Sequence, residues 1–226
     1  MTDAILSPAD SARIAAAVGA AEAHAQGEIV TVIGRASDSY GDVALAWAAA
    51  VAGLALLVLT LATGLCLNAI DGVLGLWDHR WTLREVLGLA LCLGSVTFAA
   101  VWLILRWQRL RVMLVPAPIK AARVRARAEM AFRLAAQGRT QGETGVVIYL
   151  SMAERRAEIV ADATIAAKVA PEVWGDAMHA MLDHFRATRV ADGMVAGVAA
   201  VGTVLARHFP RGAKPANELP DGPIEL

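Results

Sequence analysis

Two long runs without a charged side chain constrain this sequence more than any other feature. The first run extends from Val43 to Ile70, about 28 residues, and the second from Val86 to Leu105, about 20 residues. A helix needs about 20 apolar residues to cross the hydrocarbon core of a bilayer. Neither run has the polar face of a helix on the surface of a soluble protein. The sequence therefore predicts a transmembrane hairpin over residues 43–105, with spans at 43–67 and 86–105.

Aromatic and basic residues flank the two predicted spans. Tryptophan is enriched where a membrane meets water, because its ring is apolar and its N–H is polar. We therefore expect one set of side chains at the membrane interface. This set comprises Trp47, Trp77, Trp81, Trp102, Trp107, Arg106, Arg109, Arg111, Lys120, Arg123 and Arg127. Lys120, Arg123 and Arg127 share one helix face, which either meets anionic headgroups or is simply solvated.

The distribution of Lys and Arg predicts the orientation. The connector between the runs has Arg80 and Arg84, whereas basic residues are dense after the second run and no acidic residue occurs there before Glu129. Basic flanks stay in the cytoplasm. We expect a multi-pass protein of the bacterial inner (cytoplasmic) membrane whose soluble domain lies on the cytoplasmic side.

The remaining sequence alternates helical and strand patterns. Ser7 and Pro8 open a helical pattern over 5–26, with Ser7 as the cap, and Glu28–Ile33 reads as a strand. Pro116 and Pro118 are expected to break the helix that follows the second span. Further expected elements are helices at 119–137, 164–169, 171–188 and 192–209, a loop at 138–142, strands at 144–150 and 157–161, and a disordered tail at 210–226.

A single strand before the hairpin is the key to the domain organisation. A lone strand leaves both of its edges unpaired and cannot fold by itself. The strand at 28–33 should therefore join the sheet formed by 144–150 and 157–161. Residues 5–37 and 116–209 then form one α/β domain, and the hairpin is an insertion into it.

This order of elements resembles the TPM domain family. The matching segments are Leu6–Ile33, Thr144–Asp162 and Ala191–Pro210, of which the apolar strand, polar turn and return strand of Thr144–Asp162 are the most specific. The resemblance implies a three-layer α/β/α sandwich with a small mixed sheet, here interrupted by the two-helix transmembrane hairpin. It also implies a function as an acid phosphatase, a calcium-binding protein or an accessory factor of a membrane complex. Members with enzymatic or calcium assignments carry acidic loop positions, which are here Glu143, Glu154, Asp162 and Asp192.

Two groups of side chains are candidate metal ligands. Glu143, Asp162 and Asp192 would bind Ca²⁺ or Mg²⁺ if they converge at one end of the sheet, where α/β proteins place ligand sites. Asp176, His179 and Asp183 recur at i, i+3 and i+7 on one helix face and could also hold a divalent cation. The alternatives are a helix cap for Asp192, a turn residue for Glu143 and a solvated face for the helical group.

Charge and motifs exclude several functional classes. Lys and Arg total 21, as do Asp and Glu, so the global basic field of a nucleic-acid binder is absent. The sequence has no P-loop, G-x-S-x-G, H-E-x-x-H or C-x-x-C motif, and no cofactor other than Ca²⁺ or Mg²⁺ is expected. We expect the lipid bilayer and another membrane protein or complex as partners, for which this chain acts as an anchored accessory module. The alternative is a metal-dependent phosphatase-like hydrolase on the same fold.

Overall fold

The computed structural model describes residues 4–75, 80–135, 144–170, 172–186, 189–210 and 221–226. The chain forms two compact units, which are described separately. Residues 39–115 form the hairpin unit, and residues 1–38 together with 116–226 form the sheet unit. The boundaries between the units lie close to the ends of the two apolar runs.

The sheet unit is built around a mixed four-stranded sheet in the order β3-β2-β1-β4. The strands are β1 (Glu28–Gly34), β2 (Gly145–Ser151), β3 (Arg156–Ala161) and β4 (Ile224–Glu225). β1 runs parallel to β2 along its whole length, from the pair Glu28–Gly145 to the pair Gly34–Ser151, and β2 and β3 form an antiparallel hairpin. The strand at 28–33 therefore joins the sheet formed by 144–150 and 157–161, as expected, through its pairing with β2.

Helices cover both faces of this sheet. α1 (Pro8–Glu22), α8 (Val173–Arg186) and α9 (Val190–His208) pack on one face, and α6 (Ala117–Ala135) packs on the other. Alternate residues of the central strands supply the two cores, as period-two strands require. Ile29 and Ile33 contact the first core, whereas Val30 and Val32 contact the second. The fold is the expected α/β/α sandwich, with the short helix α7 (Ala163–Ala166) following β3.

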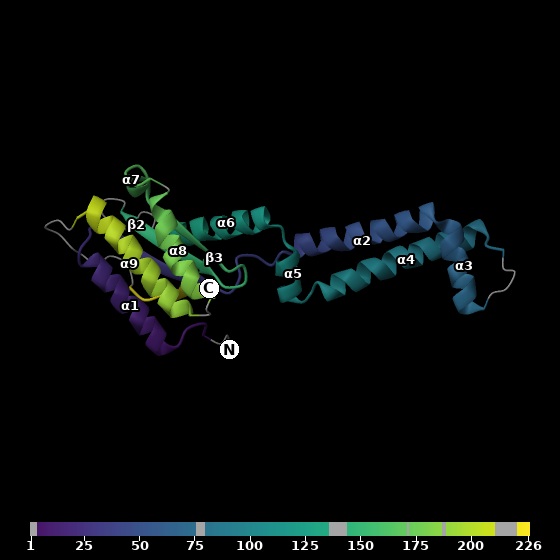
Figure 1. Cartoon of the computed structure of the whole chain (residues 1–226), viewed down its shortest axis with the longest axis horizontal. Coiled ribbons are helices and arrows are strands. Elements are labelled where there is room, and N and C mark those ends of the chain that lie inside the picture. Colours follow the sequence, from purple (N-terminus) through teal and green to yellow (C-terminus); the bar gives the residue numbers. More distant parts are fainter. Residues whose placement is uncertain (1–3, 76–79, 136–143, 171, 187–188, 211–220) are drawn as a thin grey trace. The chain divides into compact units, whose positions relative to one another are not determined.

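The hairpin unit consists of α2 (Gly41–Leu61), α3 (Thr63–Leu74), α4 (Leu83–Ile104) and α5 (Gln108–Leu114). Within this unit α2 and α4 pack along each other (Figure 1). Ala44, Ala48 and Ala52 lie on one buried face of α2, and a Cβ on Gly94 of α4 would lie 3.3 Å from the Leu56 side chain. Small residues of this kind allow two apolar helices to approach closely.

Four sequence-based expectations about the helices are wrong in detail. The helix of the first predicted span ends at Leu61 rather than 67, because Ala62 leaves the helical region at φ −120° and α3 begins at Thr63. Helix α1 covers 8–22 rather than 5–26, and α5 had no counterpart in the predictions. The expected break is present at Pro116, because α5 ends at Leu114 and Val115 is extended. Pro118 instead lies in the first turn of α6, where N–H groups have no intrahelical partner to lose.

The tail also differs from the expectation. Residues 224–225 form β4, which pairs in parallel with β1 at Val32 and Ile33, so the end of the tail is not disordered. Its Pro- and Gly-rich composition pointed to disorder, but the edge of β1 provides partners that composition does not reveal. Residues 211–220 of the tail and the expected loop at 138–142 lie outside the described residues.

Candidate functional site

Three helices of the described ranges are long and apolar enough to cross a membrane: α2, α4 and α9. They differ in how much of their surface the protein itself covers. In the most apolar 18-residue window of each helix, the buried share of residues is 0% for α4, 22% for α2 and 44% for α9. Helices α2 and α4 thus leave most of their apolar side chains exposed.

Helix α9 has a different environment. A Cβ on Gly202 would lie 2.6 Å from Cβ of Ala21 in α1, and a Cβ on Gly193 would lie 2.8 Å from the carbonyl oxygen of Met181 in α8. Real side chains do not tolerate contacts this short, so these glycines let α9 lie directly against its two neighbours. Its apolar composition therefore reflects burial in the core of the sheet unit.

Tryptophan and arginine side chains gather at one end of the hairpin unit. The Trp47 Nε1–H donates to the carbonyl oxygen of Leu114 at 3.3 Å, and the Arg106 guanidinium lies 5.6 Å from the ring centroid of Trp102. Trp107, Arg106 and Arg109 are exposed, whereas Arg111 is half-buried. This end therefore combines amphipathic rings with three cations, as expected of a membrane interface.

The opposite end of the same unit is held by a cap and a side-chain bond. Thr82 and Glu85 form a complete capping box at the start of α4. The Trp81 Nε1–H donates to Asp71 Oδ1 at 3.1 Å. This bond joins Trp81, just before α4, to Asp71 of α3, while Trp77 lies outside the described residues.

The other three predicted interface residues belong to α6 of the sheet unit. Arg123 forms an ion pair with Asp38 of the same unit, so part of its positive charge is already neutralised. The Arg127 Nη1 lies 3.8 Å from Met130 Sδ. Lys120 is half-exposed. The predicted basic stripe is thus less uniform than its spacing suggested.

A buried polar cluster lies at the carboxyl ends of β1 and β2, the edge at which α/β sheets usually bind ligands. Ser37, Tyr149, Ser151 and Glu154 form this strand-end cluster. The Ser37 backbone N–H donates to Glu154 Oε1 at 3.1 Å. The Ser151 hydroxyl donates to Glu154 Oε2. The Ser37 and Tyr149 hydroxyl oxygens are 3.2 Å apart.

The hydrogen bonds of the strand-end cluster connect two segments of the chain. Both carboxylate oxygens of Glu154 already accept hydrogen bonds, so the buried charge is satisfied inside the protein. The bonds join the β2–β3 turn to the segment that follows β1. Glu154 was expected only as an acidic loop position, and the cluster was not predicted. The Ser-x-x-Glu spacing directly after an apolar strand was the available signal.

The acidic residues predicted to meet at one end of the sheet do not all do so. Asp162 Oδ2 accepts the Gly145 N–H at 2.8 Å, which places this carboxylate where β2 begins. Asp192 is ion-paired with Arg13 near the start of α1. Because α1 returns the chain to the start of β1, its own start lies at the opposite end of the sheet. Asp162 and Asp192 are therefore separated by the length of the strands, and Glu143 lies outside the described residues.

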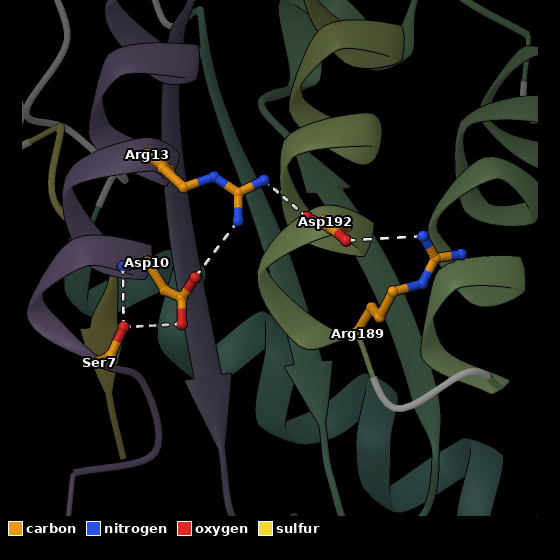
Figure 2. A network of polar contacts seen from close by, with 5 residues as sticks. All are labelled: Ser7, Asp10, Arg13, Arg189 and Asp192. Carbon is orange, nitrogen blue, oxygen red and sulfur yellow. Dashed lines mark hydrogen bonds and ion pairs between the residues drawn. The ribbon is translucent and has the colours of Figure 1, made fainter.

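Asp192 belongs to an exposed network that joins α1 to α9 (Figure 2). Arg13 bridges Asp10 at 3.3 Å and Asp192 at 2.6 Å, and Arg189 approaches Asp192 at 3.7 Å. The Arg13 guanidinium lowers the pKa of the Asp192 carboxyl. Arg189 rather than Asp192 is the residue at the N-cap of α9, so the predicted cap is wrong. Ser7 does cap α1, accepting the Asp10 N–H at 3.1 Å.

Asp176, His179 and Asp183 lie on α8, and all three are exposed. The His179 Nδ1 is 2.8 Å from the carbonyl oxygen of Gly175, one turn earlier. Over the part of the chain that the structure describes, no group of three or more His, Cys, Asp or Glu side chains could hold a metal ion.

Glu22 is a partly buried carboxyl at the beginning of the sheet. Burial, with the nearby charges of Glu28 and Asp221, raises the pKa of Glu22 to about 7, although its carboxylate accepts the Ile29 N–H at 2.8 Å. This bond caps the outer edge of β1 near its beginning.

Comparisons with known proteins agree with this architecture. Residues 108–204 match the family model of the TPM domain. No curated protein matches the chain. Among solved structures, the chain is similar to the NMR structure of BA42 protein from the psychrophilic bacterium Bizionia argentinensis, with a TM-score of 0.57 and 15% sequence identity, covering 100% of this chain and 99% of that one. At this identity the likeness concerns the fold alone.

Proposed function

Because the chain carries a TPM domain, we propose that it is a membrane-anchored interaction module. In this proposal α2 and α4 cross the inner membrane of a bacterium as a hairpin. The sheet unit lies on the cytoplasmic side and binds another membrane protein or complex.

The observation that carries this proposal is the exposed apolar surface of α4. No residue in its most apolar window is buried, and Leu87, Leu91 and Val96 are 60%, 73% and 61% exposed. An apolar surface of this extent is rare on a soluble monomer. In a bilayer the same side chains contribute favourably to insertion.

The lengths of α2 and α4 support the same conclusion. With 21 and 22 residues, they extend for about 32 and 33 Å at 1.5 Å per residue. The hydrocarbon core of a bilayer is about 30 Å thick. The helix break at Ala62 therefore falls where α2 would leave the hydrocarbon.

The charge distribution supports the proposed orientation. Arg106, Arg109 and Arg111 follow the end of α4, while the described residues of the other end balance Arg80 and Arg84 with Asp71 and Glu85. An excess of Lys and Arg marks the cytoplasmic side.

The placement of the acids favours a binding module over the hydrolase alternative. A metal-dependent phosphatase needs carboxylates that converge on one cation. Asp162 and Asp192 lie at opposite ends of the sheet, and each already has a partner within the domain.

Cysteine labelling tests the membrane topology. In a Cys66→Ser/Cys92→Ser background, Arg80→Cys should react with a membrane-impermeant maleimide from outside, whereas Glu172→Cys should react only after the membrane is broken. Both positions are exposed in the structure, so a cysteine that does not react with the maleimide is shielded by the membrane rather than by the fold. The opposite pattern contradicts the orientation, and recovery of the chain in the soluble fraction contradicts the anchor.

Co-purification tests the proposed partner. A membrane protein should be recovered with the detergent-extracted chain in a defined stoichiometry. Turnover of a phosphate monoester that requires Mg²⁺ or Ca²⁺ and is lost in Asp192→Asn would instead favour the hydrolase.

A further inference from the structure

The outer edge of β1 is closed by a strand of only two residues. β4 runs parallel to β1, pairing Ile224 with Val32 and Glu225 with Ile33. The Leu226 N–H donates to the carbonyl oxygen of Ile33 at 2.9 Å, and the Arg35 N–H donates to the carbonyl oxygen of Leu226 at 3.1 Å. Main-chain bonds of this kind hold any extended segment, whatever its sequence.

The side chains of β4 are recognised on both faces of the sheet. Ile224 packs against the core that lies between the sheet and α6, to which Val32 and Tyr149 also belong. The Glu225 carboxylate accepts two consecutive backbone N–H groups, from Ile5 at 2.8 Å and from Leu6 at 3.1 Å. The edge thus offers an apolar contact for one residue and a pair of donors for the carboxylate of the next.

The beginning of the same edge is closed differently. There the Glu22 carboxylate accepts the Ile29 N–H at 2.8 Å, so a side chain takes the place that a longer strand would fill. An incoming strand needs to displace only the short β4 to reach the pair of donors and the apolar contact. Edges left open invite uncontrolled pairing, and β4 covers this one with only two residues.

We propose that the edge of β1 from Val32 to Arg35 is a docking site for an extended segment of a partner protein. The segment runs parallel to β1 and carries an apolar residue followed directly by an acidic one. Ile224–Leu226 occupies the site within the same chain and is exchanged for the partner's segment. This inference rests on the proposed interaction function and names its surface and the chemistry of its partner.

A peptide-binding experiment tests the site directly. The probe is a fluorescent peptide with the sequence of residues 221–226, added to the purified chain in detergent. A chain ending at Pro220 has an open edge and should bind the peptide. The full chain should bind it about tenfold more weakly, if its own segment acts at an effective concentration of about 1 mM against a peptide Kd of about 100 μM.

Two control peptides establish specificity. Replacing the glutamate of the peptide by glutamine, equivalent to Glu225→Gln, should weaken binding because the two donors of Ile5 and Leu6 lose a charged acceptor. A peptide of the same composition in reversed order should not bind. Equal binding of all three peptides, or equal binding by the shortened and full chains, overturns the proposal.

A second variant covers the case in which the shortened chain fails to fold. Ile224→Asp with Glu225→Gln in the full chain releases β4 while keeping the whole sequence, and should bind the peptide as the open edge does. If this variant also unfolds, β4 is a required strand and the docking site is refuted. Peptide binding in detergent does not depend on the membrane topology. The docking site can therefore be refuted while the labelling experiment supports the membrane anchor, and the anchor can be refuted while the peptide binds.

Discussion

Replacing Leu91 by arginine distinguishes a membrane-spanning α4 from an α4 that faces water, because the two environments predict opposite effects. Leu91 lies near the middle of Leu83–Ile104 and is 73% exposed. In water, an arginine on such a surface is neutral or improves solubility. In the hydrocarbon core it is among the most costly side chains to place.

The size of the effect follows from residue insertion energies. Leucine contributes about −0.3 to −0.6 kcal/mol at the centre of a span and arginine about +2.5 to +3.5, so the substitution costs about 3–4 kcal/mol. The roughly ten Leu, Ile, Val and Phe residues of α4 together provide a similar amount. We therefore expect Leu91→Arg to lower insertion from nearly complete to about half.

The assay measures insertion of α4 in a host membrane protein with glycosylation acceptor sites on both sides of the test segment. Alkaline extraction of the whole chain provides a second readout. Leu134→Arg is the matched control, because Leu134 is 64% exposed on α6 of the sheet unit and should leave extraction unchanged. Full insertion and membrane retention of Leu91→Arg would refute the membrane assignment, and loss of retention in both variants would indicate misfolding instead.

Three further predictions concern the sheet unit, and each is tested by chemical denaturation in detergent. The pKa of Glu22 is raised from 4.5 to about 7 in the folded state, so stability should fall by about 2 kcal/mol, after allowance for partial exposure, as pH rises through this window. Glu22→Gln should remove this slope, and an unchanged pH profile would contradict the burial of the carboxyl. Gly34→Ala should cost about 1–3 kcal/mol because its Cβ would lie 2.5 Å from the Tyr149 hydroxyl oxygen, and Tyr149→Phe in the same chain should recover part of the loss. Gly202→Ala should also lower the free energy of unfolding by about 1–3 kcal/mol. Gly175→Ala, with nothing within 4 Å of its Cβ, is the control and should stabilise α8 by about 0.5–1 kcal/mol. Equal changes in the free energy of unfolding would mean that α9 packs less closely against α1.

The elements that sequence reasoning predicted correctly are those with a strong local signal. The uncharged runs make up most of α2 and α4, although each helix begins two or three residues before its run. Ser7 and Pro8 begin α1, and the apolar run after Thr144 forms β2. The need to pair the strand at 28–33 also led to the right sheet partner. Hydrophobic pattern, capping residues and strand pairing are local or nearly local properties, so one sequence reveals them.

The features that were missed depend on how distant segments meet. The break at Ala62 occurs inside an uncharged run that contains no proline, so no local signal marked it. The strand β4 forms because the edge of β1 is present beside it, which the composition of the tail does not show. Asp162 and Asp192 were predicted to meet because α/β proteins place ligand sites at one end of the sheet, but the directions of α1 and α9 place them at opposite ends.

The same strand pairing limits how the chain can pass through a membrane. β1 precedes α2, β2 follows α4, and the two strands pair along their whole length, so an even number of crossings must separate them. β4 follows α9 and also pairs with β1. If α9 crossed the bilayer, β4 would lie on the opposite side from its partner strand. The register of the sheet therefore permits α2 and α4 to span the membrane together but requires α9 to remain with the sheet, as its glycine contacts with α1 and α8 already indicate.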